Sequence, residues 1–200
     1  MLTTPTTALT AALLALTTVV AAALGLTFAG PAHATEKPAN GSFTWTTGPG
    51  VLAAWESAGI SLVGVSPGSV LTNATTKTAR VSLPVVAKSG TANATAGGFR
   101  FLNSSTGASV RCSVPTVDTR ARVVDCVLPT GYNAALFEIT TIENRNRVDT
   151  INNRTTIFQG MQLRIINREM ANRMNDELQT TVFSSSVVIG NGSLLVSRSR

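Results

Sequence analysis

The stretch Ser109–Val127, SVRCSVPTVDTRARVVDCV, decides the fold that this sequence predicts. It holds two β-type runs around Pro115–Arg120, and each run carries one of the two cysteines of the chain. A hairpin centred on Thr119 would place Cys112 and Cys126 directly opposite each other, at a separation that a disulfide can bridge. Two buried free thiols are the alternative. We favour the disulfide, because the cysteine count is even and the N-terminal sequence indicates export.

The N-terminal sequence is typical of a secretory signal peptide. Residues 1–34 contain no Asp, Glu, Lys or Arg, and a long apolar run leads to Ala32-His33-Ala34, a small-x-small cleavage site. We predict a signal peptide over 1–34, a flexible leader over 35–42 and a single β-rich domain over 43–200, secreted or at the cell surface. No Lys or Arg precedes the apolar run, so two alternatives stay open. Either the start codon lies upstream, or the segment stays uncut as an anchor.

Outward from the hairpin, short runs of alternating apolar and polar residues recur in both directions. This alternation is typical of antiparallel strands with one buried face. Besides the hairpin, we expect strands at 42–46, 60–65, 78–86, 97–102, 135–141, 161–165, 180–183 and 187–196. Pro84 predicts an edge or bulged position, and Gly190-Asn191-Gly192 predicts a turn. The charged, Asn-rich residues 143–156 are expected to form a solvated loop.

Two short helices complete the predicted fold. Val51–Ala58 has apolar residues at helical spacing and ends before Gly59, and Asn167 can cap a helix in which apolar residues recur every four positions up to Leu178. The fold class predicted is mainly β, an antiparallel sandwich-like domain with two short α-helices. The low content of charged residues, 13%, argues against a disordered chain.

Motifs of enzyme active sites occur in the sequence, but each is explained better by a turn or a solvated strand. Gly64–Gly68 matches the G-x-S-x-G nucleophile elbow, yet Pro67 has no backbone N–H for an oxyanion, and the single histidine, His33, lies in the predicted signal peptide. Gly48–Ala53 imitates a dinucleotide-binding loop but lacks the acidic residue that should follow.

Carboxylate pairs and metal ligands give equally little support for catalysis. The carboxylates that could form a glycosidase-type pair are placed on solvated strand faces by their alternating neighbours; they are Asp118, Asp125, Glu138 and Glu143. No clustered His, Cys, Asp or Glu indicates a metal site. The sequence therefore predicts a protein that is not an enzyme and has no cofactor.

Arginine is the one excess that suggests a binding surface. The chain has 13 Arg against 3 Lys, and six arginines crowd one third of it: Arg145, Arg147, Arg154, Arg164, Arg168 and Arg173. A basic face could bind an anionic wall polymer by charge and by bidentate phosphate contacts. Scattered solvated arginines with surface pairs, such as Arg173 with Glu177, are the alternative. Aromatic residues are not interleaved with these arginines, which argues against nucleic acid.

Several short motifs resemble a family of uncharacterised secreted β-rich domains of actinobacteria. Val51–Val65 is similar to the opening of that family, a helix followed by a G-V-x-V-x-P strand. Leu83–Val86 with Ser89-Gly90 resembles its F-P-I-T-G-G motif, and Ala96–Phe101 resembles its H-S-G-G-L-x-F motif. The resemblance extends to about Val196 and implies an exported β-rich domain with no assigned chemistry.

More distantly, the chain is similar to the haem-acquisition surface domains of corynebacteria. Those domains use a tyrosine and a histidine at the haem. Here the histidine of the third motif is replaced by Ala96 or its neighbour, and Tyr132 is the single tyrosine. This resemblance implies Tyr132 as a haem ligand through an anionic phenolate.

Together these features predict an exported, non-enzymatic binding or structural module of the cell envelope or medium. The expected partner is an anionic cell-wall polymer or another envelope protein, without contact to nucleic acid or, after signal cleavage, to a membrane. The alternative function is an apolar-ligand or haem carrier at the cell surface.

Overall fold

The computed structural model describes residues 37–129 and 131–199, so the predicted signal peptide, residues 1–34, lies outside the described part of the chain. The elements in chain order are β1 (Lys37–Thr47), α1 (Val51–Ser57), β2 (Ile60–Val65), β3 (Ser69–Asn73), β4 (Thr78–Ser89), β5 (Ala92–Thr95), β6 (Gly98–Asn103), β7 (Ser109–Asp118), β8 (Val123–Val127), β9 (Asn133–Thr141), β10 (Asn144–Asp149), β11 (Asn153–Ile165), α2 (Arg168–Leu178) and β12 (Val188–Ser199). β1 begins at Lys37 and so includes residues that the sequence assigned to the leader.

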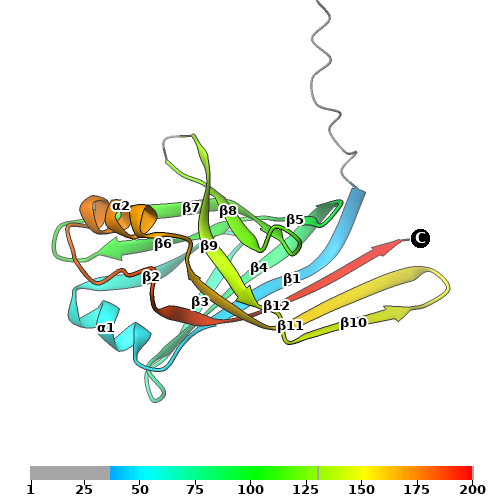
Figure 1. Cartoon of the computed structure of the whole chain (residues 1–200), viewed down its shortest axis with the longest axis horizontal. Helices are drawn as coiled ribbons and strands as arrows, with labels where there is room; N and C mark the ends of the chain where they lie inside the picture. Colours follow the sequence, from blue (N-terminus) through cyan, green and yellow to red (C-terminus); the bar gives the residue numbers. More distant parts are fainter. Residues whose placement is uncertain (1–36, 130, 200) are drawn as a thin grey trace, which may run out of the picture. The chain divides into compact units, whose positions relative to one another are not determined.

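Within the described residues, eight antiparallel strands close into a barrel. They pair in the order β7-β5-β4-β1-β12-β11-β9-β8, and β8 pairs with β7 again to complete the ring. The remaining strands extend the sheet outside the ring: β6 and β2 continue from β7, β3 pairs with β4, and β10 pairs with β11. In Figure 1 both helices lie at one end of the barrel, and the β10–β11 hairpin and the end of β12 lie at the other.

The barrel corrects the predicted sandwich, although the mainly β class and the two helices are confirmed. Alternation reports only that one face of each strand is buried, and this is equally true of both architectures. Closure depends on β7, which pairs with β6 through Ser109–Ser113 and with β5 through Thr116–Asp118. A bulge between Ser113 and Thr116, where Val114 has a φ of 44°, lets one strand join both partners.

The cysteine hairpin has a different register from the one predicted. Val117 pairs with Val124 and Ser113 pairs with Val127, so the turn is displaced from Thr119 toward Arg120 and the cysteines are not directly opposite. The disulfide is nevertheless present, with a Cα–Cα distance of 5.0 Å between Cys112 and Cys126. It joins β7 to β8, the pairing that closes the ring.

Aromatic side chains fill the barrel toward the helical end. Trp45 of β1 contacts Phe99 of β6 and Phe137 of β9, both at 5.7 Å between ring centroids, and all three are buried. Trp55 of α1 continues this cluster onto Phe101 at 5.2 Å, in an edge-to-face arrangement. This end of the barrel is therefore closed by packed rings.

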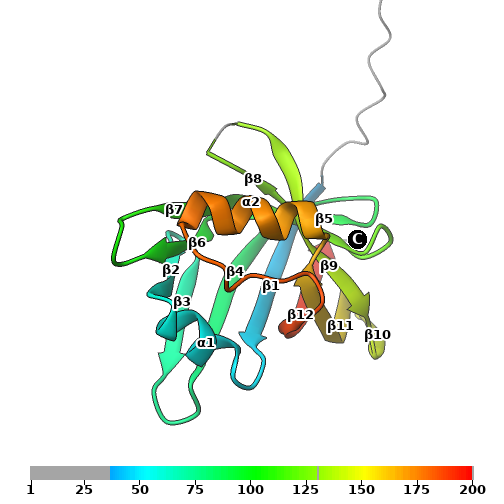
Figure 2. The ribbon, with the colours of Figure 1, turned by 60° about the vertical axis from the view of Figure 1, so that its left-hand side comes forward.

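The second helix starts where the sequence predicts. The Asn167 side chain accepts a hydrogen bond from the Met170 backbone N–H at 2.8 Å, which satisfies one of the free donors at the start of α2. Met174 and Leu178 are buried. The helix packs on β6, β7 and β11, and in Figure 2 it crosses above the strands.

Three local predictions were wrong. Residues 143–156 are not a loop but contain β10 and the start of β11; every residue of β10 is exposed, so no apolar alternation marks the strand. Residues 180–183 form no strand. Gly190-Asn191-Gly192 is not a turn but part of β12, where a Cβ on Gly190 would come within 2.3 Å of the Thr46 carbonyl oxygen.

Pro84 is tolerated because of its place between two partners of β4. On one side of β4, residues up to Ser82 pair with β3 and residues from Val85 onward pair with β5. Pro84 lies between these two paired segments. On its other side the strand continues to pair with β1. The predicted bulge is present one residue further on, between Val85 and Ala87.

Candidate anion-binding site

A cavity of about 610 Å³ opens at the end of the barrel opposite the helices. It lies where β4 turns into β5, β7 turns into β8 and β9 passes into β10. Six of its lining residues are cations: Lys88, Arg120, Arg145, Arg147, Arg154 and Arg198. The other described residues that line it are Gly90, Thr91, Thr119, Ile142, Thr156, Phe158 and Val196, so no Asp, Glu or His of residues 37–129 and 131–199 lines the cavity.

The register of three strands places the arginines side by side. Across β10, β11 and β12, Arg147 is paired with Thr156 and Thr156 with Val196, while Asp149 is paired with Arg154 and Arg154 with Arg198. Side chains at directly paired positions project from the same face of a sheet. These strands therefore present one face with a basic outer part and an apolar inner part.

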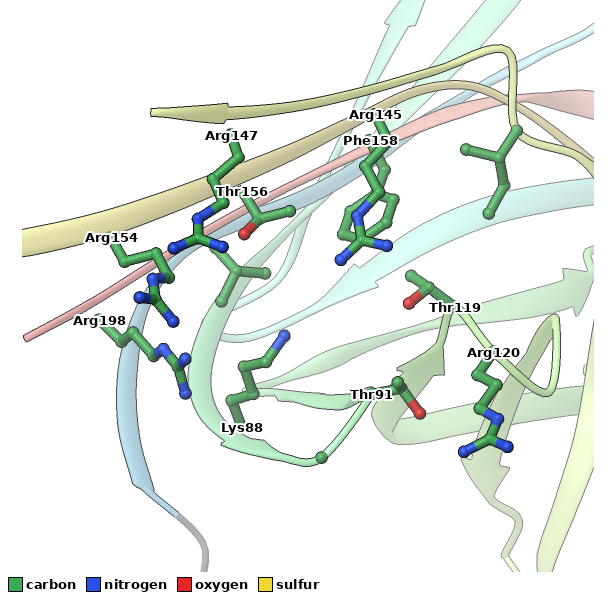
Figure 3. Close-up of a pocket in the computed structure, with 13 residues that line it drawn as sticks. Lys88, Thr91, Thr119, Arg120, Arg145, Arg147, Arg154, Thr156, Phe158 and Arg198 are labelled. Carbon is green, nitrogen blue, oxygen red and sulfur yellow. The ribbon is translucent and has the colours of Figure 1, made fainter. Parts of the chain in front are cut away.

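Lys88 completes the cavity from the opposite wall. It is paired with Asn93 in the β4–β5 hairpin, and its ammonium lies 3.5 Å from the Asn93 Oδ1. Asn93 is fully buried and is held in place because its Nδ2 donates to the Thr91 and Val117 carbonyls at 2.9 and 3.0 Å. Figure 3 shows the Lys88 ammonium directed toward the space below Arg145, with Arg198 beside it.

The Lys88 ammonium experiences an unfavourable positive field. Burial lowers the pKa of Lys88 from its usual value, and the nearby charges of Arg198 and Arg145 lower the pKa further. Desolvation and like charge both disfavour the protonated amine. An anion bound in the cavity would oppose the lowering of the Lys88 pKa by the neighbouring positive charges.

Carboxylates neutralise only part of this basic cluster. Asp149 accepts from Arg147 at 2.6 Å and from Arg154 at 3.3 Å, and its hydrogen bond raises the pKa of Arg147. Within residues 37–129 and 131–199, no ion pair involves Lys88, Arg145 or Arg198. We call these three residues the cation triad.

The apolar part of the wall supports one member of the triad. The Arg145 guanidinium carbon lies 5.4 Å from the centre of the Phe158 ring, a cation–π contact that orients the guanidinium over the cavity. Ile142 and Val196 line the same cavity. The cavity therefore combines charged donors for an acidic group with an apolar surface for the atoms attached to it.

A hydrogen-bonded turn shapes the remaining side of the cavity. The Asp118 carboxylate accepts from the Arg120 and Ala121 backbone N–H groups at 2.8 and 3.0 Å, and from the Thr91 hydroxyl at 2.9 Å. Burial raises the pKa of Asp118, but these hydrogen bonds and the charge of Arg120 outweigh it, so the pKa lies below its usual value. The turn joins the β4–β5 and β7–β8 connections at the rim. The side chain of Arg120 extends away from the triad (Figure 3).

Three of the six arginines singled out by the sequence meet in this cavity, and three do not. Arg145, Arg147 and Arg154 line it. Arg164 pairs with Glu138 at 2.7 Å further along β11, and Arg173 pairs with Glu177 within α2, as the sequence suggested. Arg168 lies at the start of α2.

Sequence reasoning missed Lys88 and Arg198, which are distant from the arginine-rich segment in sequence. Each lies two residues beyond the end of a predicted strand, 78–86 or 187–196, and strand ends meet at the rim of a barrel. Cations near strand ends therefore indicate a shared site only when it is already known that the strands close into a barrel.

Tyr132, the residue implied as a haem ligand, lies in the β8–β9 connection. Its side chain is 75% exposed, and it does not line the cavity. Among the described residues no group of three His, Cys, Asp or Glu side chains gathers as a metal site would require.

Two of the other candidate carboxylates have defined surroundings. Asp125 lies on β8, where burial and the charge of Asp118 raise its pKa. Glu138 is held by Arg164. Gly64–Gly68 covers the last two residues of β2 and the turn after it, in which the Gly68 N–H donates to the Val65 carbonyl at 2.9 Å, as expected.

In the part of the chain that the structure describes, neither helix has the length and apolar character needed to cross a membrane.

Comparisons with known proteins give one weak structural similarity for this chain. No protein family matches it, and no curated protein matches its sequence. A solved structure, the haem-binding protein HtaB from Corynebacterium glutamicum, is similar with a TM-score of 0.47 and 13% sequence identity, over 83% of this chain and 96% of that chain. A likeness this weak carries nothing about a ligand to the present chain.

Proposed function

We propose that this protein is a binding module for an anionic ligand, whose phosphate or carboxylate group enters the open end of the barrel and contacts the cation triad. One observation carries the proposal. Lys88, Arg145 and Arg198 come from three different strands, line one cavity and have no carboxylate partner among the described residues. Charge-assisted hydrogen bonds to such a group are about twice as strong as neutral ones.

A binding role accounts for this cavity better than catalysis does. Among the described residues that line it, there is no His, Cys, Asp or Glu to act as nucleophile or general base. We place the protein outside the cytoplasm, on the support of the Cys112–Cys126 disulfide and the predicted signal peptide. Anionic ligands accessible there include the acidic polymers of the cell envelope.

The test is calorimetric titration of the purified protein with glycerol phosphate as the probe. We expect Arg198→Gln and Arg145→Gln to weaken binding about tenfold each, because a hydrogen bond to a charged group contributes about 1.5–3 kcal/mol. Arg168→Gln is the matched control, since it removes the same charge on α2, away from the cavity. Equal affinities of all three variants and the parent protein would refute the proposal.

A haem carrier is the second candidate, favoured by the apolar wall that Phe158, Ile142 and Val196 form beside the cations. The cations fit the two carboxylates of haem. The described lining residues do not fit its iron, because they include none of the His, Tyr, Cys or Met side chains that usually hold haem iron.

Titration with haemin separates this candidate from the first. A Soret shift that Tyr132→Phe abolishes would support the carrier. Binding without a Soret shift, lost in Arg198→Gln, would assign haemin to the cavity as an anion only.

A further inference from the structure

A second basic cavity adjoins the first at the rim of the barrel. It has a volume of about 810 Å³ and is lined by Lys37, Pro38, Arg154, Arg198 and Ser199. Arg154 and Arg198 line both cavities, so these two side chains form the boundary between them. Among the described residues, the two linings together contain seven cations, the six of the first cavity and Lys37, and no acidic residue.

The cations follow the rim strand by strand. β4, β1, β12 and β11 are consecutive neighbours in the barrel, and each contributes one cation at this end: Lys88, Lys37, Arg198 and Arg154. Lys37 is paired with Lys88, and Arg198 is paired with Arg154. Neighbouring strands lie about 4.8 Å apart, so the row spans roughly 14 Å. A single phosphate is too small to contact both ends of this row.

The arrangement fits successive charges on a chain better than one compact anion. Asp149 already pairs with Arg154, whereas no ion pair among the described residues involves the triad in the first cavity or Lys37 in the second. Along the strands Lys37 lies between Lys88 and Arg198, but it lines only the second cavity. A ligand that begins at the triad and crosses the boundary formed by Arg154 and Arg198 would meet Lys37 with its next charged group.

The walls argue against nucleic acid as that chain. Phe158 is the one aromatic residue in either lining, and it is 5% exposed and lies beneath the Arg145 guanidinium. Proteins that bind single-stranded nucleic acid stack bases on exposed aromatic rings, and no such ring lines these cavities.

We infer that the ligand is a linear polyol-phosphate polymer, with one phosphate at the cation triad in the first cavity and the following phosphates past the Arg154–Arg198 boundary, at Lys37 in the second cavity. This inference rests on the proposed function and adds the class of the ligand and its direction across the rim.

The experiment compares glycerol phosphate with its dimer and octamer on the purified protein. The octamer is expected to bind more tightly than the monomer beyond the statistical gain from its number of phosphates. Lys37→Ala is expected to leave the monomer affinity unchanged and to weaken the octamer about tenfold. It should also reduce the salt dependence of octamer binding by about 0.7 in the logarithmic slope, the value for one lost phosphate contact on a single strand.

Lys88→Ala and Arg168→Ala distinguish the possible failures. Lys88→Ala should weaken the monomer and the octamer alike, and Arg168→Ala should change neither. If the monomer binds through Lys88 but Lys37→Ala leaves octamer binding unchanged, the polymer inference fails and the proposed function stands. If Lys88→Ala changes neither ligand, both fail. Tighter binding of an oligothymidylate of equal charge would replace the polyol-phosphate with nucleic acid.

Discussion

Lys88 is unfavourable for folding while it is charged, and the proposed function gives it a role in binding. Its pKa is lowered in the folded protein by burial and by Arg198 and Arg145. A group with a lowered basic pKa destabilises the fold while it is charged, and this penalty is relieved as the pH rises through the folded pKa toward the usual value of 10.5. Function and stability thus oppose each other at this residue.

Lys88→Met is therefore expected to raise the melting temperature at neutral pH and to weaken anion binding. The gain should shrink as the pH rises toward 10.5, because the parent lysine then also loses its charge in the folded protein. Thermal melts over a pH series measure this. Lys77→Met, which removes an exposed lysine paired only loosely with Glu56 at 3.8 Å, is the control and should show no such trend. A parent protein that loses melting temperature relative to Lys88→Met over this pH range would contradict the assignment.

Loss of the negative charge is expected to have opposite effects on the stability of the fold at two aspartates, Asp118 and Asp125. The pKa of Asp118 is lowered, so its carboxylate contributes stability that is lost as the pH falls below the usual value of 3.8. The pKa of Asp125 is raised, so its carboxylate opposes folding above that pH.

Asp118→Asn should lower the free energy of unfolding by about 1–2 kcal/mol at neutral pH, because the turn loses charge-assisted hydrogen bonds. Asp125→Asn should leave it unchanged or raise it. Denaturant unfolding of both variants at neutral and acidic pH tests this, and the difference between them should vanish when the carboxyl groups of the parent are protonated. Equal destabilisation by the two substitutions would show that the turn does not depend on the Asp118 carboxylate.

At the scale of the element, the β7–β8 hairpin carries the covalent closure of the ring. Its cysteines are both buried and are 14 residues apart in sequence. Replacing both by serine should lower the free energy of unfolding by about 3 kcal/mol, because the unfolded chain regains the freedom that the closed loop removed. Chemical unfolding with and without reductant measures the same effect in the parent protein. An unfolding midpoint that reductant does not move would contradict it.

Strand β12 contains two glycines, Gly190 and Gly192, that differ in how much space a side chain would have. A Cβ on Gly190 would come within 2.3 Å of the Thr46 carbonyl oxygen, whereas a Cβ on Gly192 would stay 3.2 Å from the Thr44 carbonyl oxygen. Gly190→Ala is expected to lower the melting temperature strongly, and Gly192→Ala only slightly. Thermal melts of the two variants give the comparison. If both substitutions have the same small effect, β1 and β12 do not approach as closely as the structure shows.

The elements themselves were largely predictable, because local signals mark them. Asn167 and Gly59 delimit helices, and alternation marks most strands. β10 was missed since its six residues are all exposed and carry no alternation. Gly190 was misread because a turn and a close approach of two strands both select glycine.

For the molecule as a whole, the two ends of the barrel differ. Packed aromatic rings and the helices occupy one end, while the other holds the cation triad. Hydrogen exchange with saturating glycerol phosphate octamer should slow amides in the β4–β5 turn and the β10–β11 hairpin and leave α1 and α2 unchanged. Protection confined to the helices would place the ligand at the wrong end of the barrel.

The architecture and the site were predictable only in part, for the same physical reason. Alternation fixes which face of a strand is buried, but not whether the first and last strands of a sheet meet. Closure here requires the bulge at Val114, and the sequence gives no local signal for it. Without closure, Lys88 and Arg198 are residues at the ends of separate strands, and their meeting with Arg145 could not be foreseen.

The positions of β1 and β12 have a practical consequence for anyone who handles this protein. β1 starts at Lys37 and β12 ends at Ser199, and both residues border the second cavity. An affinity tag, a fluorophore or a sensor-chip linkage joined to either strand at these points would compete for the same space as a bound polymer. Attachment through an engineered cysteine on the solvent side of α2 would keep the opposite mouth open for assay.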